Sequence, residues 1–456
     1  MNSVLTEENN PIMHITSNIS PEDVHRTLAK NMLVDGFNIV LDLDKSKGSM
    51  LVDELTGDEY LDFFTFFASS PLGMNHPYLQ TEEVRNILAT VAVNKPSNSD
   101  IYTTYMAEFV DAFSRIAKPS YMKYLFFVSG GALAVENGLK VAFDWKVRKN
   151  FLKGYKEEKG HKVIHFKEAF HGRSGYTMSL TNTDINKIKF FPKFDWPRII
   201  NPKIKFPLED NLTEVIKLEE KALEQINEAI KNNPDDIALI IIEPIQGEGG
   251  DNFFRKEFFQ KLREIADKNE ILLMFDEVQT GFGLTGKFWA HEYYVKPDIV
   301  AFGKKAQVCG IMVSDRIDDI NDHCFKVSSR INSTWGANLT DMVRSRIILE
   351  VMENEKLVEN SSKVGNYLKT ELKKIRDEFP DWLDNVRGLG LMCSFDFKDK
   401  SSRDKFRDMA YKEKLLILGC GEKSIRFRPA LNITESEIEK GLHIIKKVLN
   451  LMSSNN

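Results

Sequence analysis

The chain has 456 residues, of which 62 are Lys or Arg and 67 are Asp or Glu, so its formal net charge is −5. Hydrophobic residues make up 42% and charged residues 28%, a composition typical of globular proteins that excludes disordered, collagen-like and disulfide-scaffold classes. The near balance of charge provides no global attraction for nucleic acid or an anionic membrane, so any anion site must be built locally. The length predicts two or three domains.

The four cysteines form no CxxC pair and have no histidine at zinc-ligand spacing. They therefore indicate reduced core or pocket residues in a reducing compartment, and no metal site. Residues 1–16 lack a basic stretch followed by an apolar segment, and apolar runs such as 237–242 are far shorter than the roughly 20 residues of a membrane span. We expect a soluble cytoplasmic protein that binds neither nucleic acid nor membranes.

The middle of the chain alternates short apolar runs with amphipathic helical patterns. Apolar positions at i, i+4, i+7 and i+8 predict helices around residues 135–143 and 258–266. Uninterrupted apolar strands between such helices favour a mostly parallel sheet covered on both faces, which is an α/β fold. The predicted strands are residues 124–128, 163–166, 237–242, 271–275 and 299–302.

From about residue 332 the chain is richer in helical periodicity. One strand-like run covers 391–397, and Thr434 with Glu437 forms a capping box that opens a last helix. Residues 55–60 resemble a hairpin around Gly57. We predict an N-terminal arm at 1–65, a large domain at 66–335 and a small α+β domain at 336–456.

Two strand ends carry charged residues. Asp276 follows the run 271–275, and Lys304 and Lys305 follow the run 299–302 with one glycine between. In parallel sheets, ligands bind beyond the carboxyl ends of the strands. An isolated aspartate at such a place more often caps a turn, and a lysine is more often solvated, so neither signal decides alone.

Two further strand ends carry polar loops. The first strand leads into Gly130, Gly131 and Ala132, which open a helix, and free backbone N–H groups at a helix N-terminus suit a phosphate. The second leads into Phe170 and Arg173, with His171 and Gly172 between them. For the glycine turn, a purely structural role is an equally open interpretation. Arg173 could bind a carboxylate, although arginines at the surface are more frequent. Neither GxGxxG nor GxxxxGK[ST] is present, so dinucleotide and nucleoside triphosphate sites lack their fingerprint.

Together these groups match the requirements of one cofactor. A phosphate cradle, a flat aromatic ring, a carboxylate and a strand-end lysine are the four groups that hold pyridoxal 5′-phosphate. The carboxylate keeps the pyridine nitrogen protonated so that the ring can accept electrons, and the lysine forms the Schiff base.

The chain resembles the class III, ornithine-type, pyridoxal phosphate-dependent aminotransferases of fold type I. The resemblance extends over roughly residues 57–431, and the order and spacing of its motifs make it specific. The motifs are GDEYLDFF from Gly57, GMNHP from Gly73, GGALAVENGLKVA from Gly130, FHGRSGYT from Phe170, EPIQGEGG from Glu243, FDEVQTGFGLTG from Phe275, PDIVAFGKK from Pro297, NSTWGANLTD from Asn332 and RFRPAL from Arg426.

Two departures from the general family pattern are informative. Residues 130–136 read GGALAVE where most members resemble SGTEAVE, and residues 305–310 read KAQVCG in place of a glycine-rich stretch. Both are similar to the branch that transfers the terminal amino group of L-lysine to 2-oxoglutarate. Because this chain lacks the Ser and Thr that most family members have in this turn, the phosphate is expected to bind backbone N–H groups there.

The resemblance implies a role for each cofactor contact. Lys304 is the expected Schiff-base lysine, with Lys305 structural. Asp276 pairs with the pyridine nitrogen, Gln279 contacts the phenolic oxygen and Phe170 stacks on the ring.

The remaining contacts involve the phosphate and the substrate. The backbone of Gly131 and Ala132 holds the phosphate, and Thr334 reaches the phosphate of the partner subunit's cofactor, which implies a homodimer. Substrate carboxylates are expected at Arg173 and Arg426, with Glu248 and Asn332 nearby; the full set of expected catalytic residues is Lys304, Asp276 and Glu248.

Glu248 has a special expected role. It pairs with Arg426 when lysine is bound and swings away for 2-oxoglutarate; the alternative is that it only caps a turn. Rival functions are an aminotransferase for ornithine, 4-aminobutyrate or a diamine, or a cofactor-binding protein without turnover.

Overall fold

The computed structural model describes residues 19–454. Its centre is a seven-stranded sheet with the order β3-β9-β8-β7-β6-β4-β5. The pairs β5–β4, β4–β6, β6–β7 and β7–β8 are parallel, whereas β9 is antiparallel to both β8 and β3. The sheet is therefore mostly parallel, as predicted. The strands are β3 Met122–Val128, β4 Lys162–Phe166, β5 Arg198–Ile199, β6 Ile237–Ile242, β7 Leu272–Asp276, β8 Ile299–Phe302 and β9 Cys309–Ser314.

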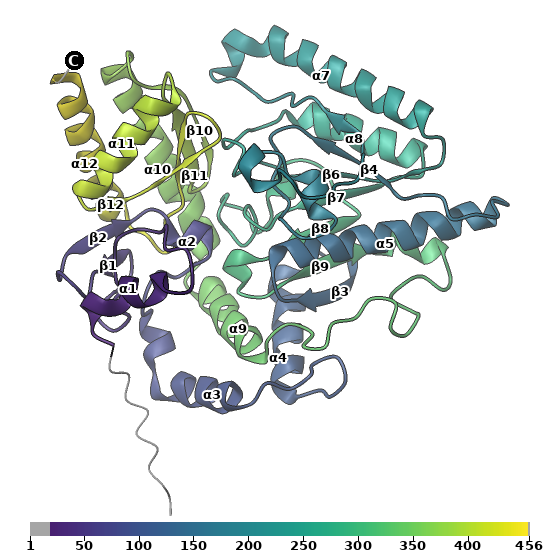
Figure 1. The fold of residues 1–456 in the computed structure, drawn as a ribbon, viewed down its shortest axis with the longest axis horizontal. Helices are drawn as coiled ribbons and strands as arrows, with labels where there is room; N and C mark the ends of the chain where they lie inside the picture. The colour runs from purple at the N-terminus through teal and green to yellow at the C-terminus, as the bar shows by residue number, and fades with distance from the viewer. Residues whose placement is uncertain (1–18, 455–456) are drawn as a thin grey trace, which may run out of the picture.

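Helices cover both faces of this sheet (Figure 1). They are α5 Gly131–Leu152 on one face, with α8 Lys256–Lys268 and α7 Leu208–Asn232 on the other. Along β6, Leu239 and Ile241 pack into the core that contains α5, while Ile240 and Ile242 pack into the core that contains α8. Because side chains alternate between faces and both faces are buried, the strand reads as an unbroken apolar run. The predicted α/β fold is confirmed.

Five of these strands, β3, β4, β6, β7 and β8, were predicted from the sequence. The strand predicted at 271–275 begins one residue later in the structure, at Leu272. The N–H of Ile271 does not join the sheet, because it donates to the carbonyl of Ala266 in the last turn of α8 (2.9 Å). Strands β5 and β9 were not predicted.

The C-terminal part contains a second, antiparallel sheet with the order β10-β11-β14-β13. Its predicted strand corresponds to β11, and Thr434 accepts from the N–H of Glu437 (3.3 Å) while Glu437 accepts from the N–H of Thr434 (2.8 Å), so the capping box is confirmed. The elements are α9 Leu339–Asn354, α10 Leu357–Glu378, β10 Asp384–Leu389, β11 Met392–Asp396, α11 Lys400–Lys412, β13 Leu418–Cys420, β14 Ser424–Phe427 and α12 Glu435–Ser454.

The N-terminal hairpin packs on this C-terminal part. Strand β2 Glu59–Asp62 lies between β1 Met50–Val52 and β12 Leu415–Leu416 in a three-stranded sheet. The predicted arm thus joins the far end of the chain, although residues 1–18 of it lie outside the described residues. The two boundaries between the three predicted segments stay predictions. The remaining helices are α1 Val24–Ala29, α2 Thr65–Ala68, α3 Glu82–Val93, α4 Thr104–Ala112 and α6 Thr177–Leu180.

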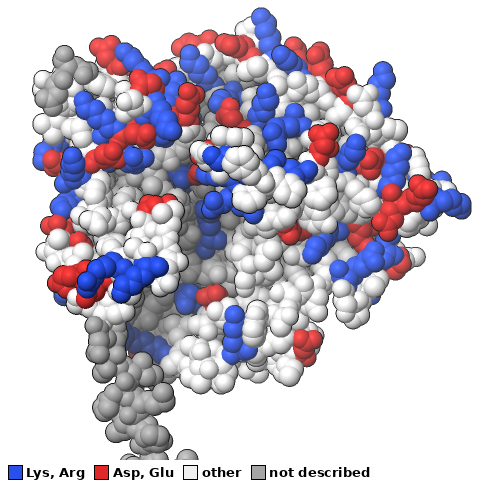
Figure 2. All heavy atoms as spheres, in the orientation of Figure 1, with Lys and Arg blue, Asp and Glu red and all other residues white. Residues whose placement is uncertain are grey.

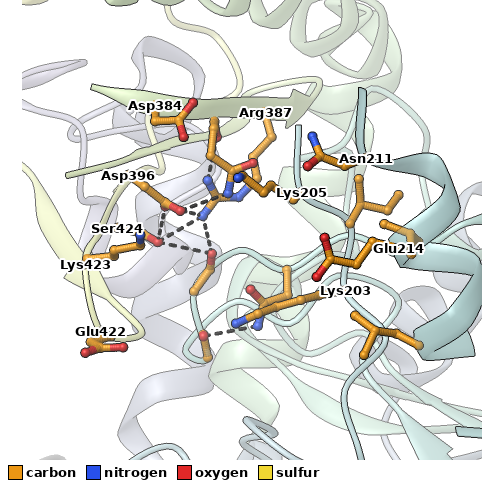
Figure 3. A pocket seen from close by; sticks show the side chains of 17 residues that line it. Lys203, Lys205, Asn211, Glu214, Asp384, Arg387, Asp396, Glu422, Lys423 and Ser424 are labelled. Atoms are coloured by element: carbon orange, nitrogen blue, oxygen red, sulfur yellow. Dashed lines mark hydrogen bonds and ion pairs between the residues drawn. The ribbon is translucent and has the colours of Figure 1, made fainter. Parts of the chain in front are cut away.

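A cavity of about 300 Å³ lies where the C-terminal sheet meets α7 and the loop at 249–252 (Figure 3). The buried Arg387 of β10 is one of the residues that line it. Arg387 donates to the Asp251 carbonyl (2.8 Å) and to Ser424 (2.9 Å), and it pairs with Asp396 (2.8 Å). Since this charge is fully partnered, it braces the two parts of the molecule against each other. Within residues 19–454, none of the helices combines the length and apolar character needed to cross a bilayer.

Candidate active site

A cavity of about 570 Å³ opens at the carboxyl ends of the central strands. Loops and strand ends from β3, β4, β6, β7 and β8 all contribute to it, as expected where parallel strands end at one edge of a sheet. Its lining comprises Ser69, Gly131, Ala132, Phe170, His171, Gly172, Arg173, Glu243, Glu248, Asp276, Val278, Gln279, Lys304, Gln307 and Cys309.

The N-terminus of α5 faces this cavity without a side-chain cap. A Cβ added to Gly131 would lie 2.9 Å from the Val278 side chain, and one added to Gly172, whose φ is +118°, would lie 2.5 Å from Cβ of Ala132. Both contacts are too close for a Cβ, and the positive φ of Gly172 also favours glycine. The 22-residue helix therefore presents its first backbone N–H groups and its positive dipole end to the cavity, a suitable site for a phosphate.

Asp276, the last residue of β7, is buried and oriented by two partners. Its carboxylate accepts from the N–H of Val278 (3.1 Å) and lies 2.8 Å from Nδ1 of His171. Nε2 of the buried His171 has no hydrogen-bond partner among residues 19–454. The Val278 N–H and the His171 ring therefore fix the orientation of the Asp276 side chain at the wall of the cavity.

Glu243 directly follows β6 at the same edge of the sheet. It accepts from the backbone N–H groups of Phe170 (2.9 Å) and Gly247 (3.0 Å) and so ties together two loops of the site. Complete burial raises its pKa well above the usual value, and the nearby Asp276 acts in the same direction. No role was expected for Glu243 or His171 from the sequence, although Glu243 ends an apolar strand in the same way as Asp276.

The two adjacent lysines take different environments. Lys304 lines the cavity, and burial lowers its pKa to about 8, with the Arg426 and Arg428 charges acting in the same direction. Lys305 points away from the cavity into the core, where it is 1% exposed and donates to the Ala68 carbonyl (2.8 Å). Of the two, only Lys304 can react with a molecule in the cavity.

Both lysines bind one turn of left-handed helix. Residues 65–68 have φ values of +42°, +51°, +59° and +68°, a conformation that costs about 1–2 kcal/mol per residue for L-amino acids. The carbonyl groups at the end of the turn accept from Lys304 (3.0 Å to Phe67), Lys305 (2.8 Å to Ala68) and Gln307 (2.7 Å to Ser69). The strained turn is therefore held by the segment that follows β8.

Gln279 is oriented by a buried arginine of the C-terminal part. Arg428 donates from Nε (3.0 Å) and from a terminal nitrogen (2.9 Å) to the Gln279 carbonyl oxygen, and it forms a buried ion pair with Asp251. With its oxygen occupied, Gln279 has its amide nitrogen available to donate into the cavity.

Glu248 lies between two cations. One carboxylate oxygen is 2.9 Å from a terminal nitrogen of Arg426, and the other is 2.6 Å from Nζ of Lys187. Burial opposes ionisation of Glu248, but the Arg426 and Lys187 charges outweigh it and lower its pKa. Arg426 is 3% exposed, and its Nε has no partner within the described part of the chain. A buried guanidinium with an unused donor is suited to bind another carboxylate.

The other predicted substrate and phosphate residues lie at or outside the rim. Arg173 is exposed where it lines the cavity. Asn332 and Thr334 are also exposed and do not line it; the Thr334 carbonyl accepts from Ser97 (2.6 Å). All other predicted site residues except Arg426 line this one cavity. Arg426 does not line it but forms an ion pair with Glu248, which does.

A family model described as Aminotransferase class-III matches residues 32–449. The chain belongs to the class-III aminotransferase family. This aminotransferase is 50% identical over 432 residues to the L-lysine-epsilon aminotransferase of Mycobacterium tuberculosis, covering 94% of this chain and 96% of that one. It is 46% identical over 439 residues to the enzyme of the same name from Amycolatopsis lactamdurans, covering 95% and 97%.

Structural comparison agrees. The lysine aminotransferase from M. tuberculosis in its internal aldimine form superimposes with a TM-score of 0.93 at 49% identity, covering 95% of this chain and 99% of that one. Human mitochondrial 4-aminobutyrate aminotransferase is a more distant relative, 32% identical over 427 residues, covering 89% and 84%. The fold is that of the fold type I enzymes, and the cofactor is pyridoxal 5′-phosphate.

The residues of the cavity fit this cofactor. The N-terminus of α5 suits the phosphate, the buried Asp276 suits the pyridine nitrogen, and the amide nitrogen of Gln279 suits the phenolic oxygen. Phe170 lines the wall, and Lys304 is the one lysine whose side chain enters the cavity from the described residues.

Proposed function

We propose that this aminotransferase transfers the ε-amino group of L-lysine to 2-oxoglutarate, giving 2-aminoadipate 6-semialdehyde and L-glutamate in a ping-pong cycle. The observation that carries this proposal is the ion pair between Glu248 and the buried Arg426 beside Lys304. The 46–50% identity to proteins named L-lysine-epsilon aminotransferase supports it.

Pyridoxal phosphate supplies an aldehyde for the amine and a ring that accepts the electrons of the cleaved C–H bond. The protein supplies the acid and base. Lys304 Nζ, whose pKa is lowered to about 8, would take a proton from the terminal carbon of the bound lysine and pass it to the cofactor within the same half-reaction. In the second half-reaction Lys304 would move a proton in the opposite sense, from the cofactor to C2 of the bound 2-oxoglutarate. The Asp276 carboxylate would hold the pyridine nitrogen in its protonated form.

The pocket must accept two substrates of different charge. Lysine presents its only carboxylate far from the reacting carbon, which suits Arg173 at the rim, and an unpaired Arg426 would then be a buried cation without a partner. Glu248 removes this cost while lysine is bound. When 2-oxoglutarate binds, Glu248 turns away, and Arg426 receives the carboxylate beside the reacting carbon.

The active form in this proposal is a cytoplasmic homodimer. Asn332 and Thr334 are exposed and lie outside their own chain's cavity, which supports a role for them in a partner's site. Large apolar side chains near them are exposed, including Tyr102 at 75% and Trp335 at 42%, and such exposure is typical of a surface that a second copy covers. The four cysteines are free, in keeping with a reducing compartment.

Absorbance spectroscopy tests the reaction. The visible band of the purified enzyme should collapse on addition of L-lysine and return on addition of 2-oxoglutarate. A band that persists with lysine but collapses with ornithine or 4-aminobutyrate would assign the enzyme to another ω-amino acid, because the cofactor residues are the same for all of these donors.

A Glu248→Gln variant tests the exchange of partners. The lysine half-reaction should lose more than the 2-oxoglutarate half-reaction, since only the former depends on the carboxylate that neutralises Arg426. Equal losses in both half-reactions contradict the exchange and leave Glu248 as a structural residue.

A further inference from the structure

Lys187 contacts Glu248 on the side opposite Arg426. Its Nζ lies 2.6 Å from one Glu248 oxygen, while Arg426 holds the other. Lys187 ends a short 3-10 turn, Ile185–Lys187, that begins with the Asp184 side chain accepting from the N–H of Asn186 (2.9 Å). This anchored turn places the amine 5.4 Å from the centre of the Phe170 ring.

The position of Lys187 matters because of what Glu248 must do. The Glu248 side chain is only 27% exposed, so a carboxylate released from Arg426 without another partner would be a poorly solvated charge. Among residues 19–454, Lys187 and Arg426 are the two cations that pair with Glu248, so Lys187 alone remains when Arg426 is occupied. Lys187 therefore stabilises the Glu248 carboxylate more strongly when a substrate carboxylate occupies Arg426 than when Glu248 itself is paired with Arg426.

The surroundings of Lys187 are consistent with this role. An outer cavity of about 630 Å³ adjoins the active site through Glu248, and its lining is more basic than acidic. Figure 2 shows Lys and Arg side chains along the hollow between the two parts of the molecule. The basic residues of this outer cavity are Lys187, Lys203, Lys400, Arg403, Arg407 and Arg426.

We infer that Lys187 is a positioning residue that receives the Glu248 carboxylate when a dicarboxylate occupies Arg426, and that it thereby sets the preference between the dicarboxylate acceptor and the monocarboxylate donor. The inference rests on the proposed function in one respect only, the exchange of Glu248 between partners. It concerns the acceptor half-reaction specifically, because the donor leaves Glu248 on Arg426.

The test compares Lys187→Met with two controls in the holoenzyme. Lys187→Arg keeps the cation, and Lys400→Met removes the same charge from the same outer cavity, where Lys400 is exposed and has no ion pair among residues 19–454. The probe is glutarate, a dicarboxylate that cannot react, with its Kd measured by calorimetry. The Michaelis constant and kcat of each half-reaction are measured beside it.

In Lys187→Met we expect the Kd for glutarate and the Michaelis constant for the dicarboxylate acceptor to rise about tenfold. The Michaelis constant for lysine should change by less than about twofold. Lys187→Arg and Lys400→Met should stay within about twofold of the parent for both substrates. In a Glu248→Gln background the Lys187→Met effect should disappear, because no carboxylate remains to be received.

Three results overturn the inference: equal changes for donor and acceptor, an equal effect of Lys400→Met, or persistence of the effect in Glu248→Gln. If the parent enzyme fails to react with lysine, the proposed donor is wrong, but the glutarate affinities still decide the role of Lys187.

Discussion

The lowered pKa of Lys304 predicts how cofactor-free protein captures pyridoxal phosphate as the pH changes. Burial disfavours the ammonium form, and the Arg426 and Arg428 cations act in the same direction, so that the pKa is about 8 instead of 10.5. At pH 7.5 about a quarter of the side chain is then the neutral nucleophile, against about one part in a thousand for an ordinary lysine, an advantage of roughly 200-fold.

Stopped-flow absorbance after mixing cofactor-free protein with pyridoxal phosphate measures this advantage. Because the amine loses its proton as the pH rises, the capture rate should increase about tenfold per pH unit below pH 8 and level off above it. Nα-acetyl-lysine, measured in parallel, corrects for the titration of the cofactor itself and should show no levelling below about pH 10.

An Arg426→Met variant supplies the internal check. It removes a cation that lowers the Lys304 pKa and leaves the Glu248 carboxylate, which raises it, so the midpoint should move to higher pH. A capture rate that keeps rising to pH 10 in the parent protein, or a midpoint that moves downward in the variant, would refute the electrostatic argument.

Three further predictions concern individual residues. Borohydride reduction and peptide mapping should place the cofactor on Lys304, and Lys305→Met should keep the visible band, since that amine faces the core; label on Lys305 would reverse the assignment. Asp276→Asn should lower kcat by about 10²–10³ while the protein still binds the cofactor, and an unchanged kcat would remove Asp276 from the chemistry. Gly131→Ala places a methyl group 2.9 Å from Val278 and should weaken cofactor affinity about tenfold with little change in kcat, as measured by equilibrium dialysis; unchanged affinity would show that the phosphate binds elsewhere.

The positions of five strands along the chain and the place of the cavity were predictable because they follow from local patterns. Apolar runs located β3, β4, β6, β7 and β8, and the rule about strand ends gathered Gly131, Phe170, Asp276 and Lys304 around one cavity. Strand β9 was not predicted because it begins seven residues after β8, inside a segment whose glycine and polar residues break the apolar run. Its antiparallel direction depends on pairing with β3, far away in the sequence.

Other features of the site depend on contacts that no local pattern encodes. The turn at residues 65–68 reads Thr-Phe-Phe-Ala, and β-branched and aromatic residues argue against positive φ, so only its contacts with the segment after β8 explain it. Lys187 belongs to a loop with no periodicity, and its role is visible only once Glu248 is placed beside it. The features of the site that were not predicted therefore depend on contacts between residues far apart in the sequence.

The pairing of β2 with β12 also constrains how the chain is made. A ribosome completes β12 about 350 residues after β2, which at roughly 5–20 residues per second means a delay of about 20–70 s. During that interval the exposed edge of the N-terminal hairpin has no partner, although its apolar residues are already synthesised. Closure of this small sheet is thus a late event in biosynthesis, and a nascent chain arrested before residue 415 should be a better chaperone substrate than the released protein.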